Sequence, residues 1–204
     1  MTEKIQVDET KLRQKAEFLD SMGLKSWSDY EAYARCLVYF DERDKASAYF
    51  LEAADKVERP LAVFEKNNPN EHSRLKLVQA NYYRLAGERE RSRVQYEQLA
   101  GELEYRLNNG ARDDSLFSHL SYCHFFLQNY EKAIHFGKKV KEWNPISVGF
   151  SEGILMGDQE RIQETLDDVI SEIQKEKSLP YYTGAEVSLW DWYEIGKELS
   201  QAVR

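Results

Sequence analysis

The sequence is poor in proline, glycine and cysteine, with 4, 10 and 2 of these residues among 204. It has no uncharged apolar run near the roughly 20 residues that a membrane-spanning helix needs, so we expect no membrane partner. Two cysteines are too few for the disulfide framework of a small secreted domain. Cys36 and Cys123 each lie in an apolar helical pattern, and we expect buried, reduced thiols. Since the opening MTEKIQVDET also lacks the apolar stretch of a secretory signal, we expect a cytoplasmic protein.

Clustered positive charge is also missing. The net charge is −8, and residues 158–204 alone carry 11 acidic and 5 basic side chains. Because nucleic-acid binding needs clustered Lys and Arg to neutralise phosphates, we expect no nucleic-acid partner. The acidic end has two explanations, which are solubility and steering toward a basic partner.

The sequence also lacks the common motifs of catalysis and metal binding. Gly149, Gly153 and Gly157 are spaced by four but have no following Lys-Ser/Thr, so we expect them to allow close helix packing, not to cradle a phosphate. His119 and His124 are five residues apart and do not share a helix face as i,i+4 metal ligands do. We therefore predict a protein that is not an enzyme, without catalytic residues, metal or cofactor. The alternative is an enzyme with a helical active site, which requires a deep pocket holding titratable groups with shifted pKa values.

What the chain does have is apolar residues at helical spacing almost throughout, so the sequence predicts an all-α fold. Ser26 and Ser28 can cap one expected helix, Asp113 or Asp114 can cap another, and Pro60 falls between two expected helices. The polar segment 65–71 has the composition of a loop. We expect about nine helices, near 8–22, 27–40, 44–58, 72–86, 88–107, 114–128, 130–143, 158–176 and 184–203.

One stretch, from Asp114 to Ser147, has the pattern of a complete helix–turn–helix unit. The small residues Ser121 and Ala133 would let its two antiparallel helices approach closely, and Pro145 would end the second helix. Such a unit cannot bury its apolar face alone, so stacked neighbours are expected.

Residues 114–147 resemble a tetratricopeptide repeat, and residues 27–60 and about 73–106 resemble degenerate copies of one. Two departures are His124 and Gly137, which stand where that family prefers aromatic or large residues. The resemblance implies a single helical-repeat domain over 1–204, built of stacked antiparallel helix pairs and closed by capping helices in 158–204. An irregular helical bundle is the alternative.

The resemblance also implies a concave groove lined by the first helix of each unit. Arg and Tyr are typical of interaction hot spots, and an Arg fork next to an amide, as with Arg74 and Asn81, suits a carboxylate. We therefore expect a non-enzymatic protein- or peptide-binding module whose ligand is an extended or helical segment with a carboxylate. Packing inside the fold and solvated surface are the alternative roles of these side chains. The predicted partner-binding residues of the groove are Arg35, Tyr39, Arg74, Asn81, Arg84, Tyr122 and Phe126.

The expected carboxyl-terminal helix is a second candidate surface. Trp190 lies on its polar face, well away from an apolar stripe. It either folds onto Tyr181 or Tyr182 as part of a cap, or anchors a partner or a second copy of the chain. The stripe consists of Leu189, Trp192, Tyr193, Gly196, Leu199 and Val203.

A second interpretation of the function rests on the acidic balance, the small size and the turn at 154–158 into an amphipathic helix. These features resemble all-α immunity proteins of bacterial toxin systems. That resemblance implies tight, salt-dependent binding to a basic toxin domain. An adaptor would instead bind short peptides with modest salt dependence.

Overall fold

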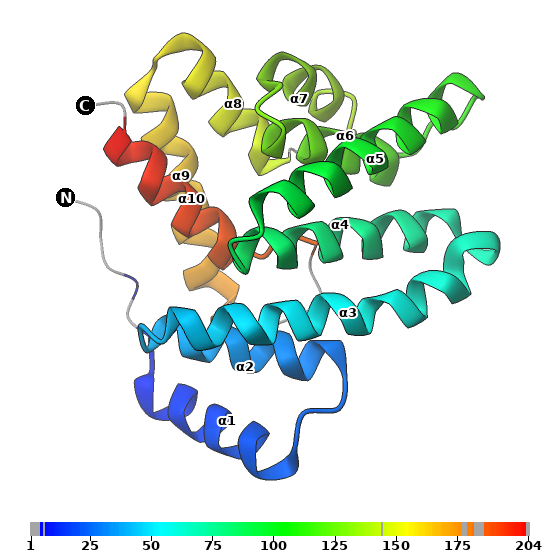
Figure 1. Ribbon diagram of the computed structural model, residues 1–204. Helices are drawn as coiled ribbons and strands as arrows, with labels where there is room; N and C mark the ends of the chain where they lie inside the picture. Colours follow the sequence, from blue (N-terminus) through cyan, green and yellow to red (C-terminus); the bar gives the residue numbers. More distant parts are fainter. Residues whose placement is uncertain (1–4, 6, 144, 177–178, 182–185, 203–204) are drawn as a thin grey trace.

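The computed structural model describes residues 5, 7–143, 145–176, 179–181 and 186–202, and within them the chain forms ten α-helices and no strand (Figure 1). This confirms the all-α prediction. In the same residues no helix combines the length and the apolar character needed to cross a bilayer. The helices are α1 (Glu9–Met22), α2 (Trp27–Tyr39), α3 (Arg43–Asn67), α4 (Pro69–Leu85), α5 (Arg89–Asn108), α6 (Asp114–Phe126), α7 (Tyr130–Gly137), α8 (Ile146–Met156), α9 (Gln159–Glu176) and α10 (Leu189–Ala202).

From α2 to α9, consecutive helices pack side by side as antiparallel pairs that stack one upon the next (Figure 1). The pairs are α2 with α3, α4 with α5, α6 with α7 and α8 with α9. The first helices of successive pairs also touch, α4 against α6 and α6 against α8. We call α2, α4, α6 and α8 the inner helices. Helix α1 packs on α2 at one end of the stack.

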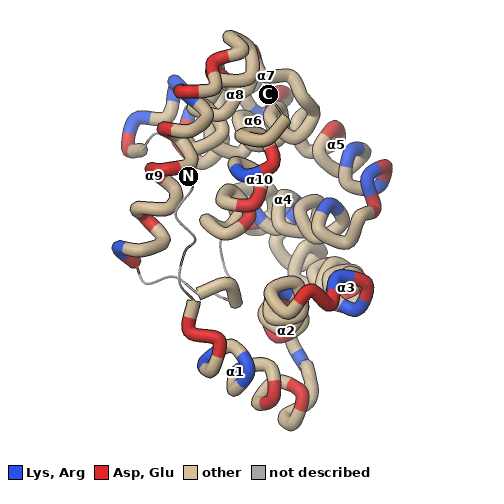
Figure 2. The backbone as a smooth tube through the Cα atoms, turned by 90° about the vertical axis from the view of Figure 1, so that its left-hand side faces the viewer, with Lys and Arg blue, Asp and Glu red and all other residues tan. Residues whose placement is uncertain are grey.

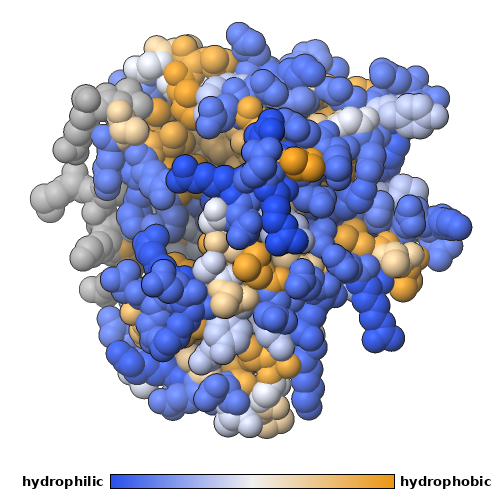
Figure 3. All heavy atoms as spheres, viewed as in Figure 1, coloured by the Kyte–Doolittle hydropathy of each residue, from blue (hydrophilic) through white to orange (hydrophobic). Residues whose placement is uncertain are grey.

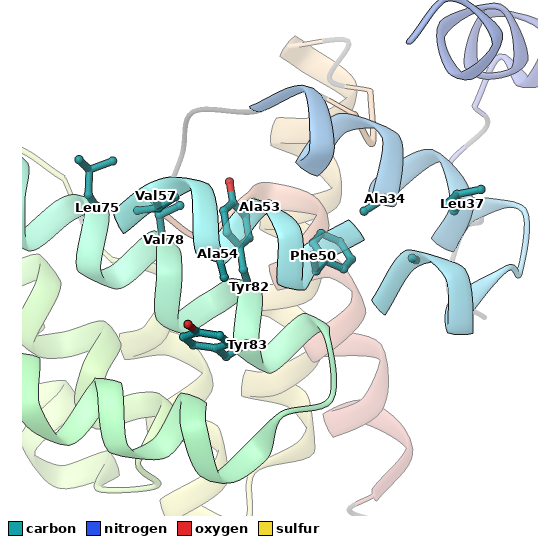
Figure 4. Close-up of a cluster of buried hydrophobic side chains, with 11 residues drawn as sticks. Ala34, Leu37, Phe50, Ala53, Ala54, Val57, Leu75, Val78, Tyr82 and Tyr83 are labelled. Atoms are coloured by element: carbon teal, nitrogen blue, oxygen red, sulfur yellow. The ribbon is translucent and has the colours of Figure 1, made fainter. Parts of the chain in front are cut away.

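Buried hydrophobic side chains form three clusters along the stack. The first joins α2, α3 and α4, and Figure 4 shows Phe50 of α3 beside Tyr82 of α4, with ring centroids 6.2 Å apart. The second joins α4 to α7, and the third joins α6 to α10. Each pair therefore buries the apolar face of its neighbour, as stacked helical units require.

The close helix crossing predicted at Ser121 and Ala133 is present. The Ser121 hydroxyl donates to the backbone carbonyl of Ala133 at 2.8 Å, and both residues are buried. Gly137 lies beside this crossing, where a Cβ atom would meet Val148 Cγ2 at 2.2 Å. A large residue is therefore excluded at Gly137 by the approach of α8.

Two predictions around α3 are wrong. Pro60 lies inside α3, which continues to Asn67, and the expected loop 65–71 is reduced to the single junction residue Asn68. Proline interrupts a backbone hydrogen bond, but Leu61 and Phe64 pack onto the first cluster and favour continuing the helix. The Asn68 side chain then accepts from the Glu71 amide and starts α4 at once.

Two boundaries near the middle also differ from the prediction. Helix α7 ends at Gly137, not near 143, because the Asp114 carboxylate accepts from the amides of Lys141 and Glu142 and holds the chain out of the helix. Helix α8 was not expected at all, since two of its residues are glycines, which disfavour helix in isolation.

Those α8 glycines allow the close packing that the sequence predicted for them. A Cβ atom on Gly149 would meet Thr165 Oγ1 at 2.4 Å, and one on Gly153 would meet Ile162 Cγ1 at 2.5 Å and the Ile162 amide nitrogen at 3.1 Å. Both neighbours belong to α9. Contact with α9 therefore outweighs the low helix propensity of these residues.

We predict opposite effects of alanine at Gly153 and at Gly101. Gly153→Ala must push α9 away and should lower the unfolding free energy by about 1–3 kcal/mol. Gly101 lies within α5 with nothing within 4 Å of its Cβ position, so Gly101→Ala should stabilise by about 0.5–1 kcal/mol. Urea unfolding of both variants is the measurement, and equal effects of the two would contradict the α8–α9 contact.

Candidate functional site

The site begins with the residues that start α10. The Ser188 amide donates to Asp191 Oδ2 at 3.0 Å, and the Asp191 amide donates to the Ser188 hydroxyl at 3.1 Å. This reciprocal pair is a capping box, and it fixes the start of α10 at Leu189, later than the sequence predicted. It also fixes the position of the Asp191 side chain, which is 4% exposed.

Asp191 forms a bidentate ion pair with Arg35 of α2. Arg35 Nη1 donates to Asp191 Oδ1 at 2.9 Å, and Nη2 donates to Oδ2 at 3.1 Å. On its other side Arg35 donates from Nε to Glu31 Oε1 at 2.9 Å, and Glu31 Oε2 accepts from the Tyr82 hydroxyl at 2.6 Å. Arg35 and Glu31 are both buried, so this is a desolvated charge network inside the fold.

Two side chains of α4 complete the surroundings of Asp191. Asn81 Nδ2 donates to Asp191 Oδ2 at 3.2 Å, and Asn81 Oδ1 accepts from Arg84 Nε at 2.9 Å. Arg84 Nη2 lies 4.0 Å from Asp191 Oδ1, which is beyond hydrogen-bond distance. Asp191 is thus held by one guanidinium, one amide and a backbone N–H, with a second guanidinium nearby.

The carboxylates of this network differ in their pKa shifts. Burial alone would raise the pKa of Asp191, but the charge and hydrogen bonds of Arg35, with Arg84 farther away, lower it below its usual value. For Glu31 burial dominates and raises the pKa, although Arg35 and the Tyr82 hydroxyl oppose it. The pKa shifts of the two carboxylates that contact Arg35 therefore have opposite directions.

Trp192 of α10 packs on the inner face, by which we mean the surface formed by the inner helices. Its side chain is 1% exposed and packs on aromatic rings of both α6 and α8. The ring centroids of Tyr122, Phe125, Phe126 and Phe150 lie 5.6, 5.1, 5.8 and 6.0 Å from that of Trp192. Through Asp191 and Trp192, α10 contacts side chains of all the inner helices, and it lies across the stack in Figures 1 and 2. Helix α10 of the same chain therefore covers part of the inner face.

A pocket of about 360 Å³ remains beside α10, and we call it the inner-face pocket. It unites four predicted binding residues from the two predicted surfaces: Arg35, Tyr39, Arg84 and Trp190. Two of its buried donors, Arg84 Nη2 and Trp190 Nε1, have no hydrogen-bond partner among the described residues. Its other lining residues are Ile5, Val7, Val38, Arg43, Phe50, Leu85, Pro180, Asp191, Tyr193, Glu194 and Lys197.

The other predicted binding residues lie elsewhere or below the surface. The sequence suggested that Arg74 and Asn81 hold one carboxylate. In the structure Arg74 pairs with Glu71 at 2.7 Å, whereas Asn81 donates to Asp191. Tyr122 and Phe126 pack against Trp192. Asn81 is buried and does not line the pocket, and its side-chain amide donates to Asp191.

Trp190 lies in the wall of the inner-face pocket. It is partly buried and packs edge-to-face on Tyr193 with centroids 5.7 Å apart. Tyr182 and Val203, which the predictions for the carboxyl-terminal helix named, lie outside the described residues. The remainder of the predicted apolar stripe, from Leu189 to Leu199, does pack into the third cluster or against other buried side chains.

Asp191 is the residue that the sequence analysis missed. The Ser188-x-x-Asp191 spacing is a capping-box signal and marks the helix start. That local signal does not reveal the second role of Asp191, since its partner Arg35 is 156 residues away along the chain.

The four histidines and two cysteines offer little for chemistry. Among the described residues, no group of three His, Cys, Asp or Glu side chains could hold a metal ion. Cys36 and Cys123 are both buried free thiols, as expected, and burial raises the pKa of Cys36 to about 11. Such thiols are poor nucleophiles at neutral pH.

His124 gives the protein a predictable pH dependence. Burial lowers its pKa, and the Lys132 ammonium adds to that effect, although Glu104 Oε1 lies 3.3 Å from Nε2. An unfolded histidine, with a pKa near 6.5, then binds its proton more readily than the folded one. Stability is therefore full above the unfolded pKa and is lost as pH falls toward the folded value.

We expect His124→Phe to lose less unfolding free energy than the wild type when pH falls from 7.5 to 5.5. The phenyl ring can keep the stacking on Phe136 and has no proton to gain. Denaturant unfolding at the two pH values measures both losses. Equal losses would show that His124 does not titrate differently in the folded and unfolded chains.

A separate apolar surface lies at the end of α8. Hydrophobic side chains gather over this region at the upper left of Figure 3, while hydrophilic ones cover most of the rest of that face. Leu155 and Met156 are 47% and 65% exposed and do not line the inner-face pocket.

Comparison of the chain with models of protein families, with curated proteins and with solved structures finds no match in any of the three.

Proposed function

We propose that this chain is a non-enzymatic protein- or peptide-binding module, tetratricopeptide-like in its helix pairs, that binds its partner at the inner-face pocket. One observation carries the proposal. Arg84 Nη2 and Trp190 Nε1 are buried donors without acceptors, and both belong to residues that line this pocket. An unmade hydrogen bond of this kind is costly, and an acceptor oxygen from a ligand would remove the cost.

The chemistry of the pocket points to the kind of segment it would accept. Val38, Phe50 and Leu85 supply apolar wall, so an apolar side chain fits there. Arg43, Arg84 and Lys197 outnumber the single acid Glu194, since Arg35 and Asp191 neutralise each other. We therefore expect a helical or extended segment with a carboxylate beside an apolar residue.

The inner face also provides an internal precedent for this mode of binding. It holds α10 by a carboxylate, Asp191, on a guanidinium and by a neighbouring aromatic side chain, Trp192, on other aromatic rings. A partner segment with the same two features would use the same physical interactions beside α10.

Capture of partners from the native host, followed by mass spectrometry, tests the proposal with matched variants. Trp190→Ala and Arg84→Glu should both lose the partner. Trp143→Ala and Arg59→Glu should retain it, because Trp143 is 44% exposed, Arg59 is exposed on α3, and neither lines the pocket. Identical capture by wild type and both pocket variants would refute the inner-face pocket as the binding site.

The second candidate is an immunity protein that binds a basic toxin domain, and the charge on α9 favours it. Glu160, Glu164, Asp167 and Asp168 of this helix are exposed, and Figure 2 shows acidic segments along α9. This function predicts association that slows steeply as salt is added. Binding through the inner-face pocket predicts a weaker dependence on salt, because its contacts are partly buried.

A further inference from the structure

A second pocket, also of about 360 Å³, opens where the start of α5 meets the end of α6. We call it the arginine pocket, because Arg84, Arg89 and Arg93 line it. Among the described residues, no acidic side chain belongs to its wall. Its volume is within the range of sites for small molecules.

A buried polar group without a partner belongs to this wall. Tyr96 is 2% exposed, and its hydroxyl has no hydrogen-bond partner among the described residues. The neighbouring Ser92 hydroxyl donates to the Ala80 carbonyl at 3.0 Å. The phenol ring stacks on Phe126 of the same wall, with centroids 4.9 Å apart. Tyr96 therefore holds a buried O–H donor at the pocket wall, and that donor lacks an acceptor in the described part of the chain.

The arginines add donors and positive charge at the same place. Arg89 is exposed and forms no ion pair within the described chain, whereas Arg93 is held by Glu90 at 2.7 Å and Glu97 at 2.6 Å. Arg84 lies over the Phe126 ring at 5.1 Å, and its unpartnered Nη2 is the donor assigned above to the inner-face pocket. Arg89 therefore has donors to offer a ligand, and Arg84 and Arg93 add positive charge beside it.

The first turn of α5 forms part of the pocket and supports the same conclusion. α5 has 20 residues, starts at Arg89, and its N-cap residue Glu88 makes no side-chain hydrogen bond to the free amides. The start of a helix carries a partial positive charge and unpaired N–H groups, and both favour an anion.

We propose that the arginine pocket binds a phosphate group. Guanidinium groups, a phenol hydroxyl and a helix start supply more donors than the two oxygens of a carboxylate can accept, whereas a phosphate has oxygens for all of them. The group can come from free phosphate or from a phosphomonoester of a small molecule. The site is separate from the proposed partner pocket, with which it shares only Arg84.

Calorimetric titration of the full chain with inorganic phosphate, phenyl phosphate and benzoate, at constant ionic strength, tests the assignment. We expect saturable binding of phosphate-bearing probes and much weaker binding of benzoate. Tighter binding of phenyl phosphate than of inorganic phosphate would identify a phosphomonoester, and equal binding would identify free phosphate. Benzoate binding as tightly as phenyl phosphate, or no saturable binding of either phosphate, would overturn the proposal.

Variants locate the binding without disturbing the fold. Arg89→Gln and Tyr96→Phe should each weaken phosphate binding by about tenfold or more, since each removes a hydrogen bond to a charged group. Neither substitution should lower the free energy of unfolding of the ligand-free protein, because neither the Arg89 guanidinium nor the Tyr96 hydroxyl has a partner in the described chain. Arg59→Gln on α3 and Trp190→Ala should leave phosphate binding unchanged. Unchanged binding in both Arg89→Gln and Tyr96→Phe would place the anion elsewhere, whatever the outcome for the partner pocket.

Discussion

Asp191→Asn is expected to lower the free energy of unfolding by about 3–5 kcal/mol, because it leaves Arg35 buried with one of its two carboxylates gone. Asparagine keeps the shape of the side chain and can still accept from the Ser188 amide, so the capping of α10 should survive. The loss therefore reports the charge pair. Urea unfolding, with hydrogen exchange resolved for α10, measures both the size and the place of the effect.

Asp168→Asn is the matched control for that substitution. Asp168 lies exposed on α9 and has no hydrogen bond or ion pair in the described part of the chain. Its replacement should change stability by no more than about 0.5 kcal/mol. Equal effects of the two substitutions would mean that Arg35 does not depend on Asp191.

Trp192→Ala is expected to cost about 3–5 kcal/mol, which is the usual range for removing a buried tryptophan. Its ring stacks on Phe126 and Phe150 and meets Phe125 at an angle, so the cavity would lie between α6, α8 and α10. We expect the same denaturation experiment to show the loss, and exchange of the α10 amides to rise with it.

The exposed Trp143 supplies the control for this second substitution. Trp143→Ala removes the same side chain at a position that is 44% exposed and should cost far less than Trp192→Ala. A loss below about 1 kcal/mol in Trp192→Ala would show that the aromatic contacts of α10 do not hold it on the inner helices.

Both substitutions bear on function as well as stability, because α10 forms one wall of the inner-face pocket. Trp190, Tyr193 and Lys197 of α10 face α2 and α4 residues across it. If α10 leaves the inner face, these walls separate and the proposed partner site is lost. Partner capture by Asp191→Asn should therefore fall under conditions in which α2 to α9 remain folded.

The helices themselves were largely predictable because their causes are local. Apolar spacing predicted the starts of α2 and α6, and of the two candidate caps at each start the structure uses Ser26 and Asp113. The crossing of Ser121 and Ala133 followed from residue size. The errors occur where tertiary contact overrides a local rule. Pro60 stays inside α3 because Leu61 and Phe64 have a core to reach, and no local signal contains that information.

The sequence predicted the types of residue that form the site, but not that a segment of the same chain already binds to them. The sequence suggested that Arg74 and Asn81 hold a carboxylate and assigned Arg35 and Arg84 to the groove more generally. In the structure Arg35, Asn81 and Arg84 surround a carboxylate. That carboxylate is Asp191 of the same chain, because the segment after α9 returns to the first helix pair. A pairing between residues so far apart depends on the path of the whole chain, which the spacing of residues within one helix does not record.

A double-mutant cycle between Arg35→Leu and Asp191→Leu tests most directly whether α10 is held on the inner helices by this ion pair. Each single change should cost about 3–5 kcal/mol, and the double variant should cost far less than their sum, since it removes both charges of this pair. Glu31 loses its Arg35 partner both in Arg35→Leu and in the double variant, so that loss cancels in the cycle. Single effects that add to within about 0.5 kcal/mol would contradict the pairing, and with it the packing of α10 on the inner face.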